Sequence, residues 1–276
     1  MHILVSNDDG IMAPGIIALA DRLAQKHRVT VVAPEKEQSA KSHALTIHNP
    51  VQLIEMNGEG VNPRRYALTG TPTDCVKFAL SYLLKDDKPD LVVSGINNGF
   101  NLGSDALYSG TVGAGMEGLF FGVPGLAVSV EKFSEERGKE IIPFVCDFIE
   151  EVFEHQGYYG MLNMNFPLTG CCDWEHCDVV NQGLMPYDSI VRREELPDGR
   201  VQYHIGGSLV FKGEDRPTDV TSIKEGRITV VALGWQQQDQ DGTEIVSTMV
   251  TAKKKAFSFI IHIIEKQVKY ACKRVV

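Results

Sequence analysis

The sequence predicts an α/β protein in which a mostly parallel sheet carries helices on both faces. Two observations support this fold class. Short apolar runs alternate with amphipathic helical segments through the first half of the chain, and repeated strand–helix–strand units of this kind form parallel sheets. With 276 residues, the chain is also long enough to bury a sizeable core.

The first half contains four expected core strands and three expected helices. A helix over Gly15–Lys26 is indicated by apolar residues at the spacing i, i+3, i+4, i+7. A second helix begins at Thr71, where Pro72 and Asp74 complete a typical helix start. A third helix is expected near Thr111–Phe121. The apolar runs place core strands at His2–Ser6, Arg28–Ala33, Asp90–Ser94 and Leu126–Val130.

The second half predicts fewer parallel units and an extended arm. A turn at Leu196-Pro197-Asp198-Gly199 separates two alternating polar segments and predicts a hairpin. We therefore divide the chain into a core, residues 1–182, and a C-terminal region, 183–276, whose hairpin arm spans about 183–219. Such arms often exchange between subunits. The remaining expected elements are a helix at Glu136–Glu154, strands at Met161–Phe166 and Gly226–Leu233, and a terminal helix at Ala252–Lys273.

Composition and charge exclude several classes of protein. The net charge of −9 argues against nonspecific binding to nucleic acid or to an anionic membrane. No apolar run approaches the length of a membrane span, and the first residues resemble a strand more than a signal peptide. Six scattered cysteines favour a reduced, cytoplasmic protein.

One cysteine cluster stands apart from the others. Cys171, Cys172, His176 and Cys177 lie within seven residues. A zinc knuckle is one interpretation, but the second spaced pair that such sites use is missing. A polar turn in a surface insertion is the alternative.

The strongest candidate site begins at Asp8 and Asp9, directly after the first strand. Two adjacent carboxylates repel each other unless a cation lies between them. Ligands in open α/β sheets bind at the carboxyl ends of the strands, which is where this pair falls. The pair therefore predicts a site for a hard divalent cation, with a turn and helix cap as the simpler alternative.

Three further segments are expected at the same edge of the sheet. One carries Ser39, a second runs from Ser94 to Gly103, and the third is Tyr108–Thr111 before a helix. Two carboxylates, one hydroxyl and one amide oxygen would form half of an octahedral shell for Mg²⁺ or Mn²⁺, which a substrate phosphate and water would complete. Phosphate oxygens would contact residues of these loops and of the helix start, namely Asn97, Gly99, Asn101, Ser109, Gly110 and Thr111. His43 is a weaker candidate for an acid or base.

These segments resemble the SurE (stationary-phase survival protein) family. The resemblance covers most of the chain and rests on NDDGIMAPGI (7–16), VAPEKEQSAKSHALTI (32–47), GTPTDCV (70–76), SGINNGFNLG (94–103), YSGTVGAGMEG (108–118), NMNFP (163–167) and TDVTSIKEGRITVVAL (218–233). It implies a Rossmann-like core and hydrolysis of nucleoside 5′-monophosphates, with 3′-monophosphates and short polyphosphate as further substrates.

The resemblance also implies how the site works and how the chain assembles. The counterparts of Asp8, Asp9, Ser39 and Asn97 hold one divalent cation per subunit, Mg²⁺, Mn²⁺ or Co²⁺, and subunits form a homodimer or homotetramer with swapped C-terminal elements. Asp8 and Asp9 are the catalytic candidates, either as nucleophile or as general base. This chain departs from the family pattern at Ala40, where glycine is common, and at Phe100, where proline is common.

Two alternatives differ from a metal-dependent nucleotidase. A haloacid-dehalogenase-type phosphatase requires Asp-x-Asp after the first strand, whereas Gly10 stands at the second Asp position here. A noncatalytic nucleotide-binding regulatory module would bind nucleotide without turnover. No membrane or specific nucleic-acid partner is expected.

Overall fold

The computed structural model describes residues 1–58, 60–185, 187–209 and 216–251. The chain separates into two compact units, Met1–Leu233 and Gly234–Val276. The predicted boundary after residue 182 is not tested by this division and stays a prediction. The predicted terminal helix at 252–273 lies outside the described residues, and the second unit contributes a described helical stretch at 240–251.

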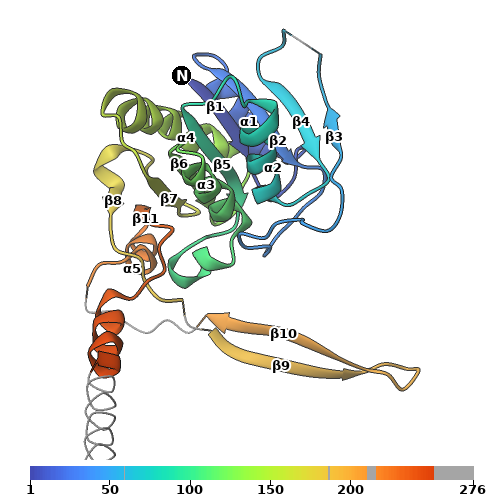
Figure 1. Cartoon of the computed structure of the whole chain (residues 1–276), viewed down its shortest axis with the longest axis vertical. Helices are drawn as coiled ribbons and strands as arrows, with labels where there is room; N and C mark the ends of the chain where they lie inside the picture. Colours follow the sequence, from blue (N-terminus) through green and yellow to red (C-terminus); the bar gives the residue numbers. More distant parts are fainter. Residues whose placement is uncertain (59, 186, 210–215, 252–276) are drawn as a thin grey trace, which may run out of the picture. The chain divides into compact units, whose positions relative to one another are not determined.

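A nine-stranded sheet forms the centre of the first unit (Figure 1). Its strand order is β3-β4-β2-β1-β5-β6-β7-β11-β8, and the pairs from β4 to β7 are parallel. This confirms the predicted α/β class. The strands are β1 (His2–Ser6), β2 (Arg28–Pro34), β3 (Leu53–Glu55), β4 (Arg64–Leu68), β5 (Leu91–Asn98), β6 (Gly125–Val130), β7 (Met161–Phe166), β8 (Cys177–Val179) and β11 (Ile228–Leu233).

Helices cover both faces of the sheet, as expected for parallel strands buried on two sides. Ile3 and Val5 of β1 pack with α1 and α4 in one apolar cluster, whereas Leu4 packs with α2 and Ala114 of α3 in another. Successive residues of a strand point to opposite faces, so one five-residue strand contributes to both clusters. The helices are α1 (Pro14–Leu23), α2 (Pro72–Phe78), α3 (Gly110–Phe120), α4 (Glu135–Phe148) and the short α5 (Asp219–Ser222).

The helix starts follow from local sequence chemistry. At α2 the Thr71 hydroxyl accepts a hydrogen bond from Asp74 N (3.1 Å), and Asp74 accepts one from Thr71 N (2.8 Å). This is the capping box that the sequence predicts. At α3 the cap is Ser109, whose hydroxyl accepts from Val112 N (3.1 Å). The last turns of α2 and α4 continue as π-helices at Ala79–Leu83 and Ile149–His155.

The later strands depart from the parallel pattern. β11 pairs antiparallel with β7 and parallel with β8, which forms the edge of the sheet. The predicted hairpin is present as β9 (Tyr187–Glu195) and β10 (Val201–Leu209), an antiparallel two-stranded sheet of its own. Its turn is closed by Leu196 N donating to Arg200 O (2.8 Å). No helix in the described part of the chain is long and apolar enough to cross a membrane.

We predict that Gly15→Ala destabilises the protein, although alanine normally favours a helix by about 1 kcal/mol. A Cβ atom at Gly15 would lie 2.6 Å from the carbonyl oxygen of Ile96, so the start of α1 would have to move away from β5. We expect a loss of about 1–3 kcal/mol in chemical denaturation. Gly58→Ala is the matched control, because nothing lies within 4 Å of its added Cβ. A Gly15→Ala protein as stable as the control would contradict this packing.

Candidate functional site

The candidate site lies where the chain changes direction across the sheet. From β1 the chain passes to β2 on one side, and it later returns through α2 to β5 on the other side. The carboxyl ends of β1 and β5 therefore border the crevice in which open α/β sheets bind ligands. Asp8 and Asp9 directly follow β1, and Asn97 lies near the end of β5.

Contacts with Thr111, Gln38 and Gly110 fix the position of Asp8. Its side chain is only 4% exposed, and Oδ1 accepts a hydrogen bond from the Thr111 hydroxyl in the first turn of α3. Its backbone oxygen accepts a hydrogen bond from Gln38 N (2.7 Å). Gly110 lies against it, because a Cβ added at Gly110 would be 3.1 Å from the Asp8 Cβ. The helix start and the Asp8 carboxylate are thus brought together by a residue without a side chain.

Asp9 links the two strands that border the crevice. Its Oδ2 accepts a hydrogen bond from the backbone N–H of Asn98 at the end of β5 (3.1 Å). The turn itself is closed by Asn7, whose side chain donates to Gly10 O (2.9 Å) and accepts from Gly10 N (3.2 Å). Asn7 is fully buried, so this turn is part of the folded core rather than a surface loop.

Burial makes the carboxylate pair electrostatically costly. Removal from water raises the pKa of Asp8 most strongly, the Thr111 hydrogen bond lowers it, and the neighbouring Asp9 charge raises it; the net result is a pKa of about 6. The pKa of Asp9 is also raised, chiefly by burial. Near neutral pH the site therefore holds concentrated negative charge that a bound cation would stabilise.

The segment that carries Ser39 is anchored beside Asp8, although Ser39 itself is exposed. The Ser39 hydroxyl donates to Glu37 Oε1 (2.7 Å) rather than to either aspartate. Ser42 fastens the segment to the residues before α3, through Ser42 N to Tyr108 O (2.9 Å) and Ser42 Oγ to Leu107 O (2.6 Å).

His43 also anchors this segment. Its Nε2 lies 2.8 Å from Oε2 of the buried Glu117 on α3, and its ring stacks on Phe120 with the ring centroids 5.7 Å apart. Glu117 also pairs with Lys77 (3.0 Å). The structure therefore places His43 against α3, where it contacts Glu117 and Phe120, and its role as an acid or base stays a prediction.

The loop after β5 divides into an outer and an inner part. Asn97 is half-buried, and its Nδ2 donates to Gly99 O (2.8 Å), which leaves its Oδ1 as the ligand-type atom. Asn101 is only 7% exposed, and its Nδ2 donates to the Ser129 hydroxyl (2.8 Å). The Asn101 side chain thus belongs to the interior rather than to the open edge where a phosphate contact was predicted for it.

Two asparagines of β7 hold this inner part of the loop. Asn163 Nδ2 donates to Asn101 O (2.7 Å), and Asn165 Oδ1 accepts from Asn101 N (2.8 Å). Their signal was present in the sequence, since both are polar residues at alternate positions of the otherwise apolar run MLNMNF. A buried polar residue in such a run usually has a specific partner.

Asp219 links the same loop to the base of the hairpin arm. It is fully buried, and its carboxylate accepts from Gly103 N and from Gly183 N, each at 2.7 Å. Three segments far apart in sequence therefore meet at one carboxylate. Gly183 is where the predicted arm begins, so the loop that follows β5 and the arm share an anchor.

Fold and site together define a class: an α/β protein whose oxygen-rich crevice lies beside a helix N-terminus. Comparisons with known proteins narrow the class to one family. The family model described as "Survival protein SurE" matches residues 3–188. This chain therefore belongs to the SurE family, as its sequence segments predict.

Relatives of this chain span nearly its whole length. It is 37% identical to "5'-nucleotidase SurE" of Thermoanaerobacter sp. over 251 residues, covering 90% of this chain and 98% of the relative. It is 42% identical to the protein of the same name from Moorella thermoacetica over 238 residues, covering 84% and 90%. Among solved structures, the SurE protein from Aquifex aeolicus matches with a TM-score of 0.76 and 31% identity, covering 90% of this chain and 99% of that one.

We predict that Asp8→Asn stabilises the cation-free protein at neutral pH. The pKa of Asp8 rises from 3.8 to about 6 on folding, so its favourable contribution is complete at low pH and is lost as the pH rises through about 6. With a chelator at pH 7.5, the variant should exceed wild type by on the order of 2–3 kcal/mol in chemical denaturation. The difference should shrink toward pH 4.

Asp86→Asn is the control for that experiment, because Asp86 is an exposed carboxylate. It should leave the pH dependence unchanged. An Asp8→Asn protein less stable than wild type at pH 7.5 would contradict the assignment of Asp8 as a buried, uncompensated charge.

Proposed function

We propose that this protein hydrolyses nucleoside 5′-monophosphates to nucleoside and phosphate. The observation that carries the proposal is the contact between Asp8, on the carboxyl end of β1, and Thr111, in the first turn of α3. This contact places the carboxylate pair, whose oxygens can bind a cation, beside a helix N-terminus, which is a common binding site for phosphate. Relatives named "5'-nucleotidase SurE", similar over most of this chain, favour the same activity. Nucleoside 3′-monophosphates and short polyphosphate are further candidate substrates.

We infer one divalent cation per subunit, held by Asp8, Asp9, Ser39 and Asn97. The donor set fits the ion: two carboxylates, a hydroxyl and an amide oxygen are ligands that Mg²⁺, Mn²⁺ or Co²⁺ accepts. Burial raises the pKa of both aspartates. A site with raised carboxylate pKa values favours added positive charge, which supports a bound cation. When bound, the cation would neutralise phosphoryl charge and lower the pKa of a coordinated water.

The chain's own groups supply the phosphate contacts in this proposal. The first turn of a helix leaves N–H groups without helical partners, and α3 presents those of Gly110 and Thr111 beside Asp8. Ser109 caps the helix and fixes the direction of these groups. Asn97, near the end of β5, and Gly99, directly after it, would border the phosphate. We assign Asn101 a positioning role, because its side chain is bonded to Ser129.

Asp8 and Asp9 have different roles in this proposal. Asp8 is buried and bonded to Thr111, so it is placed to hold the cation. Asp9 is half-buried and keeps one carboxylate oxygen free of its bond to Asn98 N. Asp9 is therefore the residue that a substrate or its attacking water reaches, and we assign it the proton-accepting role.

The activity test is phosphate release from AMP and GMP with Mg²⁺, Mn²⁺ or Co²⁺. We predict that Asp9→Asn lowers kcat by at least about 100-fold, because it removes a cation ligand and a proton acceptor. The amide keeps the oxygen that accepts from Asn98 N, so the fold should persist. Asp86→Asn is the control and should retain full activity. Nucleotide binding without phosphate release by wild type would instead indicate a noncatalytic module.

We also propose that subunits assemble through the hairpin arm into a homodimer or homotetramer with swapped C-terminal elements. A two-stranded hairpin is marginally stable without a packing partner. Val191 and Ile205 are cross-strand partners on one face of this hairpin, and they are 60% and 90% exposed. Val201 and Tyr203 extend the apolar surface along β10. We further propose a cytoplasmic location, which the five free cysteines in the described residues favour.

The arm can be tested by a change of charge on this apolar face. Ile205→Lys should lower the molar mass measured by light scattering, because a buried lysine would oppose assembly. Gln202→Lys lies on the opposite face, where Gln202 bonds Glu194 (2.8 Å), and should leave the mass unchanged. Equal masses for both variants and wild type would contradict an interface on this face.

A further inference from the structure

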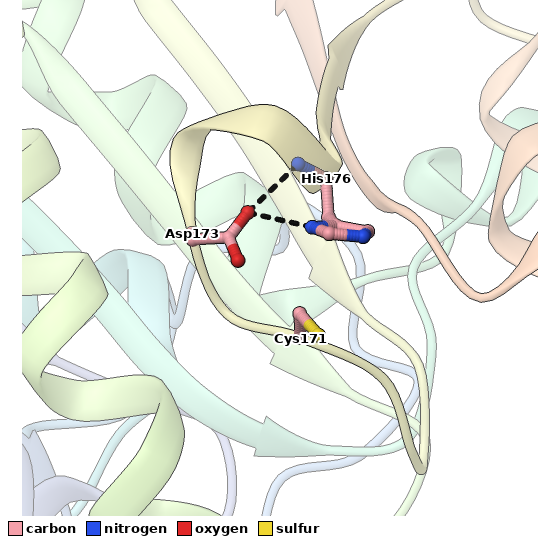
Figure 2. A group of neighbouring side chains, drawn as sticks. All are labelled: Cys171, Asp173 and His176. Carbon is pink, nitrogen blue, oxygen red and sulfur yellow. Dashed lines mark hydrogen bonds and ion pairs between the residues drawn. The ribbon is translucent and has the colours of Figure 1, made fainter.

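A second cluster of ligand-type side chains lies in the segment between β7 and β8, outside the nucleotide site. Cys171, Asp173 and His176 each present one ligand atom, and these sulfur, oxygen and nitrogen atoms lie within 4.8 Å of one another (Figure 2). In the part of the chain that the structure describes, this cluster has three His, Cys, Asp or Glu side chains close enough to one another to hold a metal ion.

The local backbone brings these side chains together. Asp173 caps a short 3₁₀ helix, Trp174–His176, and its Oδ1 accepts from His176 N (3.0 Å). In a 3₁₀ helix, residues three apart lie on the same side. The same Oδ1 lies 2.6 Å from Nδ1 of the His176 ring. Figure 2 draws both contacts between Asp173 and His176 as dashed lines. The pair is therefore preorganised before any ion binds.

The turn is fixed to the protein by residues that do not belong to the cluster. The Trp174 ring stacks on Phe148 with the ring centroids 5.6 Å apart, and its Nε1 donates to Asp147 Oδ2 (2.7 Å). Arg227 Nη2 donates to Glu175 O (2.8 Å). A turn anchored in this way loses little further conformational entropy when it binds a ligand.

Cys172 and Cys177 are less accessible to a metal ion than Cys171. Both residues pack against the apolar cluster of α1 and α4 and are only partly exposed. Cys171 is exposed. The zinc knuckle considered from sequence would use three cysteines and His176. The structure instead groups Cys171 and His176 with Asp173, and the other two thiols are not part of the cluster.

We propose that Cys171, Asp173 and His176 bind a zinc-class divalent cation, with water in the fourth tetrahedral position. Thiolate sulfur, imidazole nitrogen and carboxylate oxygen are all ligands of Zn²⁺. The thiolate and carboxylate carry two negative charges, which match the ion. Ligands of tetrahedral zinc lie about 3.3–3.8 Å apart. Ligand atoms as far apart as 4.8 Å would therefore approach one another, whereas Asp173 Oδ1 and His176 Nδ1, now 2.6 Å apart, would separate to admit the ion.

Binding requires proton release and is distinct from the chemistry of the nucleotide site. The Cys171 thiol gives its proton to solvent as the sulfur binds the ion. The proton between Asp173 and His176 Nδ1 also leaves to solvent, and the His176 ring binds through Nδ1 as the neutral tautomer that carries its proton on Nε2. Soft thiolate selects zinc-class ions, whereas the oxygen set around Asp8 suits hard ions. All three ligands precede β8, so the ion would close the turn that leads into this edge strand.

The test is titration of the reduced, metal-free, full-length protein with Co²⁺, followed by addition of Zn²⁺. We expect a near-ultraviolet thiolate-to-cobalt charge-transfer band that saturates at one equivalent of thiolate-bound cobalt and disappears when Zn²⁺ is added. Cobalt at the Asp8 site gives no such band, because that site has no thiol. The outcome is therefore independent of the proposed nucleotidase activity.

Matched variants identify the ligands. Cys171→Ser should abolish the band, whereas Cys172→Ser should keep it. His176→Ala should weaken cobalt binding about tenfold or more. Both serine variants should release phosphate at the wild-type rate. Absence of the band in wild type, or its persistence in Cys171→Ser, would overturn the proposal.

Discussion

The site depends on the burial of two adjacent carboxylates at the carboxyl end of β1. A pair of this kind is unfavourable in a folded protein unless nearby groups compensate its charge. The chain provides part of that compensation through the Thr111 hydroxyl and the Asn98 N–H group. The raised pKa of Asp8 shows that these bonds do not offset the effect of burial. A bound cation would compensate the remaining charge. The cation-free fold keeps the unfavourable burial of the carboxylate pair, and cation binding is favourable because it relieves this cost.

The surroundings of the pair are arranged to keep it in place from several directions. α3 approaches closely because Gly110 has no side chain, and the segment carrying Ser39 is tied down through Ser42 and His43. On the other side, the buried Asn101 and Asp219 fix the loop after β5 and join it to the start of the arm. Rigid support of this kind keeps groups oriented without loss of entropy on binding.

Features set by neighbouring residues were predictable from sequence, and features set by distant partners were not. The capping box of α2 and the turn of the hairpin are local, and both are present where the sequence places them. The antiparallel pairing of β11 with β7 depends on long-range contacts. Asn101 shows the same limit: a polar loop residue resembles a ligand in sequence, and only the positions of Asn165 and Ser129 reveal its interior role.

The central claim is that the buried carboxylate pair around Asp8 binds a hard divalent cation in exchange for protons. Calorimetric titration of the full-length protein with Mn²⁺ at pH 5 and pH 7.5, in buffers of different ionisation enthalpy, tests it most directly. The account predicts weaker binding at pH 5, accompanied by proton release, and tighter binding at pH 7.5 with little release. Equal affinity at both pH values without proton release, or no binding, would contradict it.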